Sequence, residues 1–122
     1  DVNRYKWNYK NISKKLDNKN SKQSIFFQKI SNLLSVRRKQ KPFHPNASRH
    51  NINLGSKIFS FKRISINKEQ TIICITNLSS KTQGAHINKI YHNWNNLIGS
   101  KIEIKNKLLI LKPFETVWLS NR

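Results

Sequence analysis

The sequence predicts an α+β chain in which a helical region precedes a small antiparallel β-sandwich or barrel. Apolar residues recur at helical spacing between Ser21 and Lys39, whereas from about residue 50 they alternate as in strands. Pro42 and Pro45 lie between the two patterns, where they end the helix and keep the following residues extended. Short alternating runs separated by turn residues are typical of an antiparallel sandwich.

The predicted helix from Ser21 to Lys39 carries an apolar stripe along one side. At ~100° per residue, its large apolar side chains fall within ~120° of one another. They are Phe26, Phe27, Ile30, Leu33 and Leu34. Ile25 and Val36 form a second, smaller patch on another side. Because no other segment is predicted to form a long helix, we expect the main partner of the stripe to lie outside this chain.

The first 20 residues are polar and rich in asparagine. Asn11 is a suitable N-cap for one or two helical turns that extend to Asn18. Tyr5, Trp7 and Tyr9 alternate, which fits a strand, stacking on a sugar or base, or packing of an irregular segment against a neighbouring surface. We favour the last interpretation.

The second part of the chain is predicted to consist of strands. The first of them places Phe59 and Phe61 on one face, and the second is apolar on both faces, as in a central strand. Residues 79–86 are predicted to form a loop, and Asn106 marks a hairpin turn. The predicted strands are residues 57–64, 71–78, 101–105, 108–111 and 115–120.

The composition limits where this chain is expected to work. It has 122 residues, begins with Asp1 and contains no methionine, so we expect a processed product or a fragment. Its beginning lacks the apolar run of a signal peptide, and no window approaches the ~18 apolar residues of a membrane span. The single cysteine, Cys74, lies in an apolar run and cannot form an internal disulfide. We therefore expect a buried thiol in a cytoplasmic protein.

The charge of the chain is strongly positive. Lysine and arginine number 24 against 5 acids, a formal net charge of +19, which is common among nucleic-acid binders. The excess is spread evenly, because residues 1–47 hold 12 basic and 2 acidic residues (+10) and residues 48–122 hold 12 and 3 (+9). Abundant lysine, asparagine and isoleucine are expected of A+T-rich coding DNA. The charge alone therefore decides no function.

Three segments carry motifs that occur in a recognisable order. Residues 26–43, FFQKISNLLSVRRKQKPF, are an apolar helix that ends in Arg-Arg before a proline. Residues 56–80, SKIFSFKRISINKEQTIICITNLSS, contain Phe-x-Arg and then a hydrophobic strand that ends in Asn-Leu-Ser. Residues 108–120, LLILKPFETVWLS, hold a Leu-x-Pro-Phe and a Trp-Leu. This order resembles the end of α-amylase-superfamily enzymes, where the last barrel helix leads into a C-terminal β-domain.

Two shorter motifs narrow the resemblance. Residues 42–48, PFHPNAS, are similar to the sucrose phosphorylase branch and its glucosylglycerate phosphorylase relatives, where Ala-Phe-His-Pro follows the helix. Residues 1–4, Asp-Val-Asn-Arg, resemble the Arg-Asp-Ile-Asn-Arg motif of that branch without its leading arginine. The resemblance thus spans nearly the whole chain.

The resemblance implies a division of the chain into two parts. Residues 1–47 would be the end of a catalytic (β/α)8 barrel with its last helix, and residues 48–122 a C-terminal all-β domain. The parent enzyme would be a retaining, cytoplasmic sugar phosphorylase that transfers glucosyl from sucrose or a related α-glucoside to phosphate. Its upstream barrel would be the main partner of this chain. No cofactor and no membrane partner are implied, and contact with nucleic acid would be nonspecific only.

Catalysis is not expected within this chain. Retaining glycoside chemistry needs two carboxylates about 5 Å apart. None of the five acids pairs with another in a recognisable active-site motif: Asp1, Asp17, Glu69, Glu103 and Glu115. By resemblance, the catalytic carboxylates lie upstream, so the chain alone should be inactive.

The resemblance carries over only Asn3 and Arg4 as substrate-binding residues, since arginine suits phosphate or carboxylate recognition. A salt bridge within the barrel is the alternative role for Arg4.

The histidines and tryptophans are the remaining candidates for ligand binding. His44, between a phenylalanine and a proline, is expected to cap a turn. His86 and His92 have no acids or cysteines at metal-ligand spacing, so no metal site is expected. Trp94 and Trp118 are expected to pack in the β core, with a surface platform for carbohydrate as the alternative.

Two other functions fit the sequence. The first keeps the superfamily and replaces phosphorolysis with hydrolysis or transglycosylation, a choice that depends on upstream sequence. The second is a basic nucleic-acid-binding β-module, in which basic residues contact phosphates and Tyr5, Trp7 and Tyr9 stack on bases.

Overall fold

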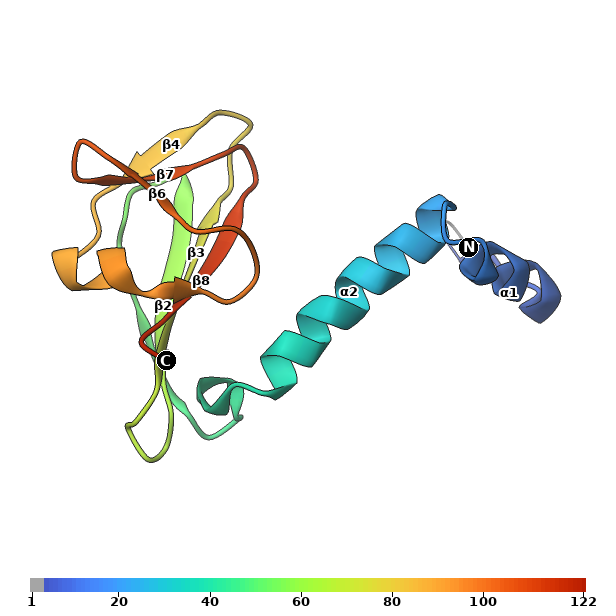
Figure 1. The fold of residues 1–122 in the computed structure, drawn as a ribbon, viewed down its shortest axis with the longest axis horizontal. Helices are drawn as coiled ribbons and strands as arrows, with labels where there is room; N and C mark the ends of the chain where they lie inside the picture. The colour runs from blue at the N-terminus through green and yellow to red at the C-terminus, as the bar shows by residue number, and fades with distance from the viewer. Residues whose placement is uncertain (1–3) are drawn as a thin grey trace. The chain divides into compact units, whose positions relative to one another are not determined.

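The structure is a computed structural model that describes residues 4–122. The chain divides into two compact units, which we call the helical unit, ending at Arg37, and the β unit, Arg38–Arg122. In the order of the chain, the helices α1 and α2 come first and the strands follow (Figure 1). None of the helices among the described residues combines the length and apolar character needed to cross a membrane.

The helical unit contains two helices with polar caps. Helix α1, Tyr9–Asp17, begins earlier than predicted from Asn11, because Asn8 is the N-cap and its side chain accepts a hydrogen bond from the Lys10 amide at 2.9 Å. Helix α2, Lys22–Arg38, confirms the predicted long helix. Its first turn is capped by the Ser21 hydroxyl, which accepts a hydrogen bond from the Ser24 amide at 3.0 Å.

Most of the apolar stripe of α2 is exposed, and Leu33 is half-buried. Phe26 and Phe27 expose 68% and 58% of their surface, and Ile30 and Leu34 are exposed as well. Ser24 is the buried residue of α2, and α1 has none. The helical unit therefore holds no buried apolar core among its described residues.

The β unit contains a five-stranded antiparallel sheet in the order β1-β2-β3-β8-β5. The strands at 57–64 and 115–120 are confirmed as β2 and β8, and the central position predicted for 71–78 is confirmed as β3. The first and last strands of this sheet were not predicted. The bounds are β1 Ser48–Asn51, β2 Ile58–Ile64, β3 Thr71–Asn77, β8 Thr116–Ser120 and β5 Asn95–Asn96.

A second antiparallel sheet has three strands in the order β4-β7-β6. Strand β4, Gln83–Ala85, lies where residues 79–86 were predicted to be a loop, and pairing with β7, Leu108–Leu111, makes it a strand. Strand β6, Glu103–Lys105, and β7 form the predicted hairpin around Asn106, where the positive φ angles of Asn106 (51°) and Lys107 (66°) form its turn.

The core of the β unit lies between the two sheets. One sheet contributes alternate residues of β3 and β8, and the other contributes residues of β4 and β7. The central residues are Ile73, Ile75, Val117 and Leu119 from the first sheet, and Ala85, Leu109 and Leu111 from the second. This arrangement of two facing antiparallel sheets confirms the predicted sandwich-like β-domain.

The Pro-Phe-His-Pro joint folds onto the β unit. Its short helix η1, Lys41–Phe43, contains Pro42, which is fully buried. The Arg63 guanidinium on β2 donates hydrogen bonds to three carbonyl oxygens of the joint: Pro42 at 2.6 Å, His44 at 2.8 Å and Ala47 at 3.3 Å. The Phe43 ring packs against Trp118 on β8, with ring centroids 4.8 Å apart. Two of the sequence motifs, Phe-x-Arg and PFHPNAS, therefore meet through Arg63.

Candidate functional site

The two residues expected to bind substrate lie at the beginning of the chain. Asn3 lies outside the described residues. Arg4 is exposed and precedes α1. Its role as a substrate-binding residue stays a prediction.

The N-terminal aromatic residues contact one another and α1. The Trp7 ring packs edge-on against Tyr5, with centroids 4.9 Å apart, and the Lys15 ammonium lies 4.8 Å from the Trp7 centroid. Tyr9 is exposed. An apolar groove of about 350 Å³ in the helical unit is lined by Trp7, Ile12, Leu16, Gln23, Phe26, Phe27 and Ile30.

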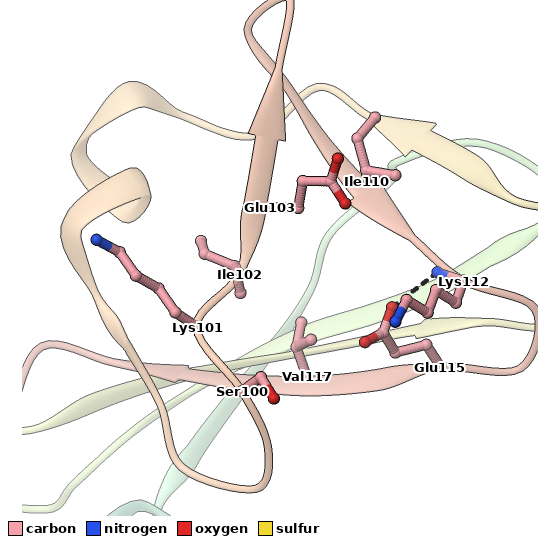
Figure 2. A pocket seen from close by; sticks show the side chains of 8 residues that line it. All are labelled: Ser100, Lys101, Ile102, Glu103, Ile110, Lys112, Glu115 and Val117. Carbon is pink, nitrogen blue, oxygen red and sulfur yellow. Dashed lines mark hydrogen bonds between the residues drawn. The ribbon is translucent and has the colours of Figure 1, made fainter.

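Two carboxylates that are distant in sequence line one pocket of the β unit. Glu103 on β6 and Glu115 before β8 line a pocket of about 140 Å³ together with Lys101 and Lys112 (Figure 2). The sequence did not predict that Glu103 and Glu115 line the same pocket, because this depends on how the strands are arranged in space. We call this cavity the glutamate pocket.

The glutamate pocket is not suited to glycoside chemistry. Its volume of about 140 Å³ is well below the ~300–1,000 Å³ of typical small-molecule sites. The Glu115 carboxylate accepts a hydrogen bond from the Lys112 amide at 2.7 Å (Figure 2). The Glu115 amide donates to the Lys112 carbonyl at 3.1 Å. Glu115 therefore closes the turn between β7 and β8. Glu69 lies elsewhere, within 3.4 Å of Lys41 and of Arg122.

The histidines do not gather into a metal site. Among residues 4–122, no cluster of three or more histidine, cysteine, aspartate or glutamate side chains suits a metal ion. His44 Nδ1 accepts a hydrogen bond from the Asn46 amide at 3.2 Å, which confirms its predicted role in capping a turn. His86 is exposed. His92 Nε2 is buried and has no hydrogen-bond partner among the described residues.

The two tryptophans of the β unit have different surroundings. Trp118 packs against Phe43, whereas Trp94 lies against the core between the sheets and packs edge-on against Tyr91, with centroids 4.8 Å apart. Trp94 also lines a pocket of about 510 Å³, which we call the Trp94 pocket. Its lining residues are His92, Asn93, Trp94, Asn95, Asn96 and Lys101. The sequence singled out Trp94 but did not predict this pocket.

Cys74 is confirmed as a buried thiol. It lies on the central strand β3 with 4% of its surface exposed. Burial raises the pKa of the Cys74 thiol from 9.0 to about 12, and the positive charge of Arg63 opposes part of this rise. Because the thiolate is the reactive form, this cysteine is chemically inert in the folded chain.

Comparison with known proteins supports the resemblance that the sequence motifs indicated. No protein-family model matches the chain. Over 119 residues it is 23% identical to glucosylglycerate phosphorylase of Escherichia coli (strain K12), a match that covers 97% of this chain and 20% of that protein. A solved structure named "Family GH13_31 enzyme" has a TM-score of 0.59 at 20% identity, and the match covers 91% of this chain and 18% of that one.

Both relatives are much longer than the present sequence. The chain spans about a fifth of the length of glucosylglycerate phosphorylase and of the GH13_31 enzyme. The likeness to the solved structure is one of fold, and the alignment with the phosphorylase extends over 97% of this chain at 23% identity. The resemblance inferred from the motifs is thereby confirmed: this chain is similar to the C-terminal part of an α-amylase-superfamily enzyme.

Proposed function

We propose that this chain is the C-terminal scaffold of a sugar phosphorylase that transfers glucosyl from sucrose or a related α-glucoside to phosphate. The observation that carries this proposal is the match to glucosylglycerate phosphorylase over 97% of the chain. The catalytic carboxylates would belong to the upstream barrel, and Asn3 and Arg4 would approach its substrate site. The complete enzyme would be cytoplasmic and would need no cofactor.

The exposed stripe supports a missing barrel as the partner. Helix α2 would be the last helix of a (β/α)8 barrel, and residues 1–47 would belong to that barrel. Phe26 and Phe27 are more than half exposed, and full burial of such a side chain is worth roughly 1.5–3 kcal/mol. An upstream barrel would supply the cover that the helical unit lacks.

The joint supports the role of residues 48–122 as an attached β-domain. Arg63 holds the backbone of the joint to β2 through three carbonyl oxygens. A chain that leaves a barrel helix would therefore be fixed to the β sheet within a few residues. Scaffolding of this kind needs no catalytic side chain in the β unit.

The proposal is tested with the longer protein that joins this chain to its proposed upstream barrel. Purified enzyme is incubated with sucrose or glucosylglycerate, with and without inorganic phosphate, and the release of glucose phosphate is measured. Phosphate-dependent release is expected, and the isolated 122-residue chain serves as the inactive control. Turnover by the isolated chain would contradict the absence of catalytic residues here.

Hydrolysis or transglycosylation is the second candidate function. The fold match to a GH13_31 enzyme is equally compatible with this function, because that match does not distinguish acceptors. The same assay separates the two candidates, since this function predicts free glucose or a new glycoside at equal rates with and without phosphate.

Binding of nucleic acid, if measured, is expected to be weak and without preference for single strands, as for any chain with a net charge of +19.

A further inference from the structure

The Trp94 pocket has the size of a small-molecule site. Its volume of about 510 Å³ lies within the ~300–1,000 Å³ that such sites typically have, unlike the glutamate pocket. A continuous run from the end of the short helix η2, Lys89–Asn93, through strand β5 forms most of its lining. Lys101, from the loop before β6, completes it. All of these residues belong to the β unit.

The pocket combines an aromatic ring with unused amide groups. Trp94 is half-buried and offers an apolar surface, whereas Asn93 and Asn95 are exposed. Neither of these two amide side chains makes a hydrogen bond to the residues that the structure describes. Each amide has two N–H donors and a carbonyl acceptor, which match the hydroxyl groups of a sugar. An aromatic face beside such groups suits the C–H face of a hexose ring.

The framework of the pocket is held by hydrogen bonds. Asn96 Nδ2 donates to the Ser100 carbonyl at 3.0 Å, and Asn96 Oδ1 accepts from the Trp118 amide at 3.0 Å. The Trp94 amide donates to the Tyr91 carbonyl at 3.1 Å, and the two rings pack edge-on. Because these bonds fix the backbone on both sides of Asn95, a ligand would meet a preformed site.

Two further side chains add polar capacity to the pocket. Lys101 makes no ion pair with the described residues, and Figure 2 shows it extending away from Glu103 and Glu115. Its ammonium group would favour a ligand that carries a negative charge. His92 Nε2 is buried without a partner among residues 4–122, and such atoms are rare in folded proteins.

We propose that the Trp94 pocket binds a saccharide of one or two hexose units. The Trp94 ring packs against the sugar ring, and Asn93 and Asn95 bond to its hydroxyl groups. Lys101 gives preference to a phosphorylated sugar. This site is separate from the reaction of the proposed parent enzyme, because no carboxylate lines it.

The test uses the 122-residue chain and NMR spectra of its ¹⁵N-labelled amide and indole groups. Sucrose, glucose and glucose 1-phosphate are titrated separately. Saturable shifts confined to residues 91–101 are expected, with glucose 1-phosphate binding several-fold tighter than glucose. Shifts without saturation, or shifts elsewhere on the chain, would overturn the proposal.

Substitutions then separate binding from folding. The double variant Asn93→Ala/Asn95→Ala changes exposed side chains, so it should keep the spectrum of the folded chain while binding about tenfold more weakly. Trp94→Ala should abolish binding, and Lys101→Ala should remove only the preference for glucose 1-phosphate. Trp7→Phe, in the helical unit, is the matched control and should bind normally. Unchanged affinity in the double variant would contradict the proposal, and neither outcome bears on phosphorolysis by the complete enzyme.

Discussion

The helical unit and the β unit differ in how they bury apolar residues. All of the core residues between the sheets belong to the β unit, and several of them, such as Leu109 and Leu119, expose no surface. In the helical unit, by contrast, the largest side chains of α2 are exposed and the buried residue is a serine. Hydrophobic burial is the main favourable term in folding. The β unit therefore has its own source of stability, whereas the described part of the helical unit holds no buried apolar core.

The largest effect should come from emptying the core of the β unit. Leu109→Ala removes a fully buried side chain on β7 and should lower the free energy of unfolding by ~2–5 kcal/mol. The matched change in the other unit, Phe26→Ala, removes an exposed side chain and should cost less than ~0.5 kcal/mol. Urea unfolding followed by tryptophan fluorescence measures both. Equal losses would mean that the stripe is buried within this chain.

A smaller effect is expected where the joint is fastened to the β unit. Arg63→Ala removes three hydrogen bonds to the carbonyls of Pro42, His44 and Ala47, and should cost ~1.5–3 kcal/mol. Amide hydrogen exchange in residues 41–47 should become faster, while exchange in β7 changes little. Arg49→Ala is the control. The Arg49 guanidinium lies 4.7 Å from the Phe61 ring centroid, and loss of this cation–π contact should cost ~0.5–1 kcal/mol. If exchange in the joint is unchanged in Arg63→Ala, the three bonds do not hold it.

The buried thiol of the β unit should make its stability depend on alkaline pH. Burial raises the pKa of Cys74 from 9.0 to about 12, so above pH 9.0 the unfolded chain loses a proton that the folded chain keeps. The free energy of unfolding should therefore fall as pH rises from about 9 towards 12. Cys74→Ala lacks this contribution, so the stability difference between the wild type and this variant should shrink between neutral pH and pH ~10. Urea unfolding at both pH values measures it, and a constant difference would refute the buried thiol.

The smallest effect, and one of opposite sign, is expected at the β6–β7 turn. Lys107 adopts a φ of 66°, which costs a non-glycine residue ~1 kcal/mol, so Lys107→Gly should raise the free energy of unfolding by ~0.5–1 kcal/mol. Lys105→Gly, in strand β6, should instead lower it by about the same amount. Thermal unfolding of both variants tests the pair. Destabilisation by Lys107→Gly would show that the turn needs its lysine side chain.

Sequence periodicity predicted the elements that carry many apolar residues. Helix α2 was predicted within one residue at each end, and β3 was recognised as central because Ile72 and Ile73 point to opposite faces. The Asn106 hairpin was predicted because asparagine tolerates a positive φ. In each case the local sequence and the packing favour the same structure, so the pattern was sufficient.

Elements that depend on their neighbours were missed. Strand β4 contains Gln83 and Gly84, which have no strand pattern, and its pairing with β7 makes it extended. Strand β5 has only Asn95 and Asn96, and asparagine is depleted in strands, so its pairing with β8 could not be predicted. The Trp94 pocket surrounds this missed strand. The sequence singled out its tryptophan, but it predicted no role for Asn93 and Asn95 on either side of it.

The contacts of Arg63 also bear on how shortened versions of this protein are made. A truncated chain that begins at Ser48 would lack all three carbonyl oxygens that the guanidinium binds, together with the phenylalanine ring that packs on Trp118. Such a product would leave a charged group without its acceptors on the sheet surface. A first residue near Arg38 retains the whole set, and it is the better starting point for expressing the sandwich alone.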